Sequence, residues 1–229
     1  MRVIAITFFF SIISCFNLTL SASRDVGELK DQTPKFEENY WQYDYLRIVD
    51  NLLYGVPDSD SLVAECLGFI DNAISANRAD IEKSINIYGK DYMVTSIGEK
   101  AFKDCQFLQK VTIPDCIRTF GKECFKGCVN LQSVEIPEST EIIDNYAFCS
   151  CKQLQKAILP ASLKILNTGL FYNCTQLVDV VIPEGVTHIG MNAFNGCSAL
   201  KELYIPESVT HIDLDAFSGC DNLENLIMP

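Results

Sequence analysis

The amino-acid sequence predicts a β-rich solenoid over residues 92–229, in which short coils of chain stack on one another. Phenylalanine, cysteine, leucine and proline recur in four columns that start at Phe102, Cys105, Leu108 and Pro114. All four share one constant period, the spacing from Phe102 to Phe125, without insertion or deletion. Each period also holds two short stretches of alternating apolar and variable residues, which are typical of half-buried strands. One coil cannot bury its own apolar side, so stability must come from stacking. We expect about six repeats, the last one incomplete.

The predicted order of elements begins with a signal peptide at 1–23. Arg2 precedes an apolar run to about Leu20, and small residues follow. Two alternatives stay open. One is a retained anchor helix, and the other is a lipoprotein signal, because residues 12–15 resemble a bacterial lipoprotein box in which Cys15 would be lipidated. No later segment is apolar enough to span a bilayer, so we expect membrane attachment only through a lipid anchor.

Two segments separate this leader from the repeats. Residues 24–44 are polar and acidic and predict a linker. Residues 45–91 indicate short strands broken by turns, since residues 50–51 and 58–61 are turn formers. The stretch 62–74 also fits one face of a helix, but we interpret it as strand.

The repeat unit can be written Leu-x-x-Val-x-Ile-Pro-x-x-Val-x-x-Ile-Gly-x-x-Ala-Phe-x-x-Cys, and residues 89–98 lead into its first copy. This spacing is similar to that of the BspA-like (Treponema-type) leucine-rich repeat family. The resemblance implies a leucine-rich repeat stack at 92–229 with a short N-terminal β-hairpin cap at 45–91. It also implies a secreted or surface-attached protein that adheres to host extracellular-matrix proteins or to other cells.

One outward-facing column marks a candidate binding surface. At this position of the first strand, successive repeats carry Thr112, Glu135, Ile158, Val181, Tyr204 and Ile227. A contiguous exposed apolar stripe with an aromatic residue is typical of a binding surface. Simple filling of a sheet face by residues of high β-propensity is the alternative. The apolar members are our predicted partner-binding residues: Ile158, Val181, Tyr204 and Ile227.

The cysteine column predicts buried free thiols. Coils stacked at strand spacing bring the cysteines close enough for disulfides, but parallel side chains in a ladder suit a disulfide poorly. Outside this column, we expect Cys124 in the core and Cys116 and Cys149 at the surface.

The two histidines lie one period apart, so His188 and His211 should be neighbours on adjacent second strands. With Asp213 nearby, they could share a metal ion. The same column holds serine, threonine and isoleucine in other repeats, so exposed ladder residues without a chemical role are the simpler interpretation.

Composition narrows the function further. The chain has 18 Lys+Arg against 30 Asp+Glu, a net charge of −12, which argues against a nucleic-acid partner. With only two histidines a three-histidine zinc site is excluded, and we find no nucleophile–base pair or phosphate loop, so we expect neither an enzyme nor a cofactor. We expect a secreted or cell-surface protein that binds proteins. A structural envelope or periplasmic lipoprotein without a specific ligand is the alternative, and the exposed apolar end also allows end-to-end self-association.

Overall fold

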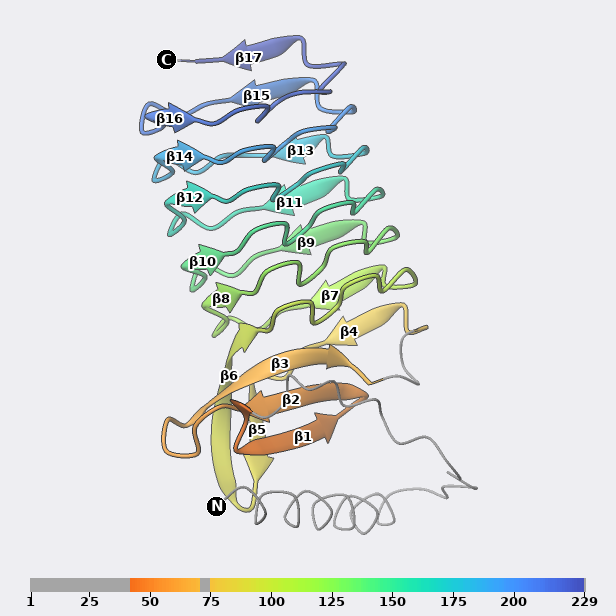
Figure 1. Cartoon of the computed structure of the whole chain (residues 1–229), viewed down its shortest axis with the longest axis vertical. Coiled ribbons are helices and arrows are strands. Elements are labelled where there is room, and N and C mark those ends of the chain that lie inside the picture. The colour runs from red at the N-terminus through yellow and green to blue at the C-terminus, as the bar shows by residue number, and fades with distance from the viewer. Residues whose placement is uncertain (1–41, 71–74, 229) are drawn as a thin grey trace. The chain divides into compact units, whose positions relative to one another are not determined.

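The computed structural model describes residues 42–70 and 75–228, and the regular structure there consists of β-strands joined by turns (Figure 1). The predicted leader at 1–23, its Cys15, and residues 24–41 of the predicted linker lie outside the described residues.

Residues 42–97 form an N-terminal module in which most strand neighbours are antiparallel. Five of its strands belong to one sheet: β1 (Tyr45–Val49), β2 (Leu52–Val56), β3 (Val63–Phe69), β5 (Ser84–Ile87) and β6 (Lys90–Ile97). β1 and β2 form a hairpin, β2 pairs with β3, and β5 pairs with β6. The predicted turn lies at Asp50 and Asn51, which both have positive φ, as a tight hairpin turn requires. The strand interpretation of 62–74 is confirmed over β3.

The contacts of the module begin at Tyr43, two residues before the predicted module boundary. Its ring packs so closely over Gly55 that a Cβ there would lie 2.5 Å from ring carbon Cδ1. Its hydroxyl donates to Glu65, and the backbone N–H of Asp44 donates to Val56 O at 2.7 Å. Burial raises the pKa of Glu65, and the Tyr43 hydrogen bond partly offsets this.

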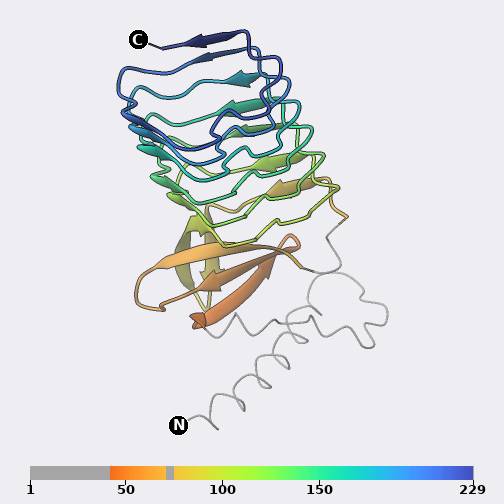
Figure 2. The ribbon, with the colours of Figure 1, turned by 45° about the horizontal axis from the view of Figure 1, so that its top comes forward.

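The repeats form two ladders of short strands, one from each strand-like stretch of the period (Figures 1 and 2). The first-strand ladder comprises β7 (Lys110–Thr112), β9 (Ser133–Glu135), β11 (Lys156–Ile158), β13 (Asp179–Val180), β15 (Glu202–Tyr204) and β17 (Asn225–Ile227). The second-strand ladder comprises β8 (Thr119–Phe120), β10 (Ile142–Ile143), β12 (Ile165–Leu166), β14 (His188–Ile189) and β16 (His211–Ile212). Paired neighbours run parallel and one period apart, which confirms the predicted register.

Both ladders start inside the module. β6 pairs in parallel with β8 at the repeat offset, with Ser96 opposite Thr119. The remaining strand, β4 (Arg78–Asp80), pairs in parallel with β7, but the offset from Arg78 to its partner Lys110 is longer than one period. The module therefore supplies the first strand of each ladder. β6 keeps the spacing of the repeats, whereas β4 does not.

The core between the ladders is a row of stacked phenylalanines. Phe102, Phe125, Phe148, Phe171 and Phe194 are all fully buried. Centroids of successive rings lie 5.0, 5.3, 5.9 and 5.6 Å apart, and a further contact to Phe217 is 5.7 Å. Offset aromatic stacking at this distance adds to the hydrophobic gain of burial. The predicted alignment of phenylalanines in a row is confirmed.

The return bend of each coil contains two residues in the left-handed region, and this feature was not predicted. Both recur once per period: one column holds Lys100, Glu123, Tyr146, Gly169, Asn192 and Asp215, and the other holds Asp104, Gly127, Ser150, Asn173, Gly196 and Gly219. Apart from Ser150, the second column uses glycine, asparagine and aspartate, which tolerate positive φ, whereas the first also uses lysine, glutamate and tyrosine. Bend N–H groups donate to the next coil, as from Phe125 to Ala147 O at 2.8 Å, so the bend is also a ladder.

The cysteine column forms a chain of sulfur hydrogen bonds. The described cysteines are free thiols, as predicted. Each repeat thiol from the second onward donates to the phenylalanine carbonyl oxygen of the preceding coil, for example Cys128 to Phe102 O at 3.0 Å and Cys174 to Phe148 O at 3.1 Å. Burial raises the pKa of the Cys174 thiol well above its usual value. The column is therefore not only buried, as predicted, but also links successive coils through hydrogen bonds, which the sequence analysis did not predict.

Of the other cysteines, Cys124 is buried as predicted and Cys116 is partly exposed. The expectation that Cys149 lies at the surface is wrong, because its side chain is buried. In its column it stands between Lys126 and Tyr172, and its sulfur lies 3.5 Å from Ser150 Oγ.

Candidate functional site

The apolar stripe, which we define as Ile158, Val181, Tyr204 and Ile227, is exposed and follows consecutive coils. The side chains are 44%, 68%, 43% and 53% exposed, respectively. Tyr204 is opposite Ile227 in the β15–β17 pair, and the pairing of Lys156 with Asp179 brings Ile158 beside Val181. The structure thus brings these residues together as a surface, while their role in binding stays a prediction.

Strand alternation explains why these positions point outward. The residues that precede the first three stripe positions, Ala157, Val180 and Leu203, are buried, so the next side chain must face the opposite side. In the first two coils the stripe position holds Thr112 and Glu135, which gives the same column a polar surface. The apolar surface therefore begins at the third coil.

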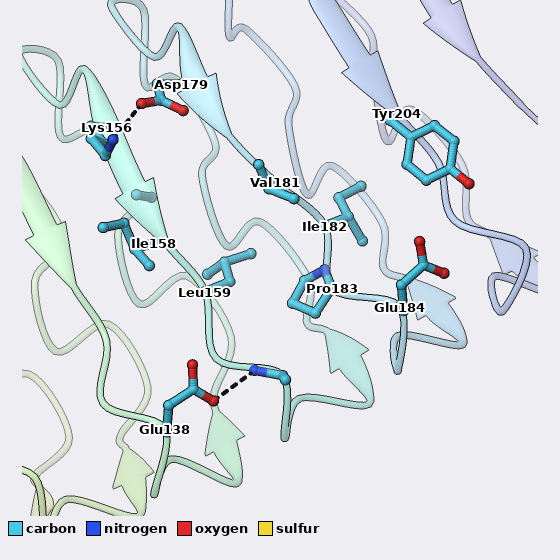
Figure 3. A pocket seen from close by; sticks show the side chains of 12 residues that line it. Glu138, Lys156, Ile158, Leu159, Asp179, Val181, Ile182, Pro183, Glu184 and Tyr204 are labelled. Atoms are coloured by element: carbon cyan, nitrogen blue, oxygen red, sulfur yellow. Dashed lines mark hydrogen bonds and ion pairs between the residues drawn. The ribbon is translucent and has the colours of Figure 1, made fainter.

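A shallow depression of about 460 Å³ lies over the middle of the stripe. Ile158, Val181 and Tyr204 line it together with the apolar chain that follows the strands at Leu159 and Ile182. Figure 3 shows the charged residues around it: Lys156 and Asp179 lie on one side, and Glu138 and Glu184 on others. An apolar floor with a charged edge is the arrangement found at many binding sites.

The charges at this edge are predominantly negative. Lys156 Nζ lies 2.7 Å from Asp179 Oδ2, so these two groups neutralise one another. The Glu138 carboxylate accepts the backbone N–H of Ala161 at 3.0 Å, and that contact does not cancel its charge. Glu184 is exposed. Three carboxylates and one ammonium line the depression, which leaves two uncompensated negative charges. Sequence analysis missed Glu138 and Glu184, although both directly follow the periodic proline.

The histidine pair is adjacent, as its spacing predicted. The rings of His188 and His211 stack with centroids 5.8 Å apart and an interplanar angle of 17°. His188 Nε2 lies 2.9 Å from Asp213 Oδ2, and His211 Nδ1 lies 2.8 Å from Thr210 Oγ1. Within residues 42–70 and 75–228, no group of three or more histidine, cysteine or acidic side chains is placed to hold a metal ion. The pair is therefore a stacked and hydrogen-bonded part of the second-strand ladder.

An ion-pair cluster on the return bend was not predicted. Glu123 Oε2 and Oε1 lie 2.7 Å from Lys103 Nζ and Lys126 Nζ, respectively. The hydrogen bonds from these two lysines lower the pKa of Glu123 to about 2. Each lysine comes from the same position of a successive repeat, so the contact links two coils. The sequence signal for this cluster is the pair of lysines one period apart, Lys103 and Lys126, with Glu123 close by.

No helix in the described parts of the chain has the length and apolar character needed to cross a membrane.

Comparison with known proteins finds a family model and solved structures that match the repeats. A family model described as a BspA type Leucine rich repeat region matches residues 93–228 in six copies. Among solved structures, the Treponema pallidum leucine-rich repeat protein is similar at 29% identity and a TM-score of 0.70, covering 79% of this chain and 80% of that one. No curated protein gave a match.

Two further solved structures are similar over most of this chain. A leucine rich cell surface protein from Faecalibacterium prausnitzii A2-165 is 26% identical, with a TM-score of 0.66 and coverage of 80% of this chain and 54% of that one. A leucine-rich repeat protein from Bacteroides ovatus is 25% identical, with a TM-score of 0.63 and coverage of 82% and 54%. The chain spans about half the length of these two proteins.

Proposed function

Because the chain belongs to the BspA-type leucine-rich repeat family, we propose that it is a secreted or cell-surface protein whose repeats bind a partner protein and mediate adhesion to host or other cells. Leucine-rich repeats support the protein-binding part of this proposal. The likeness to a cell surface protein of F. prausnitzii and the signal-like residues 1–23 support the location. The function requires no catalytic step and no cofactor.

The observation that carries the binding function is the apolar stripe. Four neighbouring coils expose apolar side chains on one face, whereas the residues that precede the first three of them, Ala157, Val180 and Leu203, fill the core. Exposing such side chains together is unfavourable in water, and a partner that covers them regains the hydrophobic free energy. Aromatic residues such as Tyr204 are also enriched among the residues that dominate binding energies.

We propose further that the fold is a solenoid capped at its N-terminal end by residues 42–97. Two observations support this. β6 and β4 supply the first rungs of the two ladders, and the antiparallel sheet of β1, β2 and β3 lies beyond them. A repeat stack needs such a module to cover the apolar side of its first coil.

A binding experiment with matched variants tests the proposed function. Immobilised host extracellular-matrix proteins should bind the chain saturably, and the double change Val181→Ser with Tyr204→Ser should weaken binding at least about tenfold at unchanged Tm. The control is Ile142→Ser with Ile165→Ser, which removes apolar side chains of similar exposure, 53% and 45%, from the second-strand ladder. It should leave affinity unchanged.

Two outcomes would count against the proposal. Equal affinity of the stripe variant and the wild type would remove the stripe as the binding surface. Absence of saturable binding to any matrix protein would favour the structural lipoprotein alternative. Mass spectrometry of the mature N-terminus decides the anchor, because a diacylglyceryl group on Cys15 identifies a lipoprotein and a free terminus near Arg24 identifies secretion.

A further inference from the structure

The depression over the stripe combines an aliphatic floor with acidic edges. Ile158 and Val181 provide branched apolar side chains, and Tyr204 adds an aromatic ring. Glu138 and Glu184 lie at the edges, from coils two periods apart (Figure 3). Strand spacing of about 4.8 Å per coil puts these two positions on the order of 10 Å apart along the stack.

The acidic character extends beyond the depression. The position after the periodic proline holds an exposed acidic residue in four of five repeats: Asp115, Glu138, Glu184 and Glu207, with Ala161 between them. Asp115 is paired with Lys83 at 2.8 Å, so the uncompensated charges are those of Glu138, Glu184 and Glu207. Lys156, the cation that lines the depression, is already paired with Asp179. Lys164 Nζ lies 3.0 Å from the position that a Cβ at Gly185 would take. The ion pairs of the described residues do not include one between Lys164 and Glu184. The local field therefore attracts cations.

Lysine and arginine side chains match this combination of features. Each carries an aliphatic stem that packs on apolar surface and a charged head that remains at the wet edge. An arginine or lysine lying on Ile158 and Val181 could reach the carboxylates, and the face of Tyr204 offers a cation–π contact. An acidic segment would meet like charges at both edges and would be repelled.

We propose that the depression binds an extended, basic segment of the partner protein through its arginine or lysine side chains. This inference rests on the proposed function and specifies the chemistry of the partner. Residues two apart in an extended peptide face the same side at about 6.6–6.8 Å. Two such basic residues with flexible stems can therefore contact both edges, from Glu138 to Glu184.

Three fluorescently labelled, blocked peptides test the inference by their Kd values. One alternates arginine and serine, the second replaces each arginine with neutral citrulline of nearly the same shape, and the third replaces it with glutamate. We expect the arginine peptide to bind about tenfold more tightly than the citrulline peptide and the glutamate peptide not to bind. Raising the NaCl concentration from about 0.05 to about 0.5 M should reduce the difference, because salt screens exposed charges.

Variants of the acidic edge provide the second arm. Glu138→Gln and Glu184→Gln should each weaken arginine-peptide binding about threefold, and together about tenfold. Asp215→Asn is the control: it removes one negative charge from a residue that does not line the depression and keeps a residue type that tolerates its positive φ of 58°. It should leave Kd unchanged.

The outcomes separate this inference from the function on which it rests. Equal binding of arginine and citrulline peptides, or no binding of either, overturns the basic-segment inference. If matrix-protein binding is also lost in the stripe variant but retained in the double Gln variant, the stripe binds a partner that is not basic. If the stripe variant binds matrix proteins as tightly as the wild type, the stripe is not the binding surface, and this inference is overturned with it. If no matrix protein binds the wild type saturably, the proposed function itself fails.

Discussion

In the coils a buried side chain packs against copies of itself, whereas in the N-terminal module each buried contact occurs once. Phe125 stacks between Phe102 and Phe148, and the thiol of each coil repeats the hydrogen bond of its neighbour. In the module, the buried Tyr54 hydroxyl accepts a hydrogen bond from the Glu82 N–H at 2.9 Å, and the Tyr43 hydroxyl donates one to the Glu65 carboxylate. Neither of these two hydrogen bonds is repeated elsewhere in the described residues.

This difference follows from how each region fixes its strand register. Copies stacked at one spacing align without special residues, so all ladder pairs between repeats keep the same offset of one period. The module instead uses register shifts between Leu53 and Tyr54 and between Ala64 and Glu65. Stability in the coils is consequently a sum of similar nearest-neighbour contributions, while the module depends on a few single contacts.

Removing one member of the phenylalanine row should have the largest effect. Phe148→Ala deletes a fully buried ring that stacks on both neighbours, so we expect the free energy of unfolding to fall by about 3–5 kcal/mol. Urea denaturation measures this. Phe107→Ala is the control, because Phe107 is largely exposed outside the column, and a comparable loss there would contradict the packing account.

Gly68→Ala should have the next largest effect, since it disturbs the contact between module and first coil. A Cβ at Gly68 would lie 1.5 Å from the backbone oxygen of Ala101, and φ is +99°. We expect a loss of about 3 kcal/mol, from positive φ together with the clash. Gly89→Ala also has positive φ, +82°, but no atom lies within 4 Å of its Cβ, so about 1–2 kcal/mol is expected there. Equal Tm values for the two variants would show that the junction between module and first coil accommodates the added methyl group without loss of stability.

The smallest effect concerns pH and the Glu123 cluster. Because the pKa of Glu123 is lowered to about 2, its ion pairs stabilise the fold above the usual carboxyl pKa of 4.5 and are lost as pH falls toward 2. Allowing for solvent screening of the partly exposed lysines, this contribution is on the order of 2 kcal/mol.

Unfolding of Glu123→Gln and wild type at pH 3–7 measures the contribution. Their stability difference should be constant near neutral pH and shrink below about pH 4.5. Glu141→Gln removes a more exposed carboxylate, 3.4 Å from Arg118, and should show little pH-dependent difference. A difference for Glu123→Gln that persists unchanged at pH 3 would refute the role of its ionisation.

The repeats were predictable from sequence because the residues that build them recur. The periodic Phe102 and Cys105 columns fixed the stacking, and strand alternation correctly placed Val181 and Tyr204 at the surface. Rung β4 could not be predicted, because its offset from β7 does not match the period.

The edges of the candidate site were not predictable by the same means. Glu138 and Glu184 follow a proline in a turn, where alternation no longer determines the direction of a side chain. Positive φ at Tyr146 also left no mark in the sequence, because tyrosine has no preference for that conformation. The conformation at such positions depends on the neighbouring coils and not on the residue itself.

The chain of thiols gives each coil its own chemical marker. Only the thiolate reacts readily with alkylating reagents, and burial raises the pKa of Cys151 and Cys174 far above neutrality. These sulfurs therefore become reactive when their coil opens, and the mass added at each cysteine reports where along the stack the chain has come apart. Pulsed alkylation followed by peptide mapping would thus follow local opening coil by coil without any introduced label.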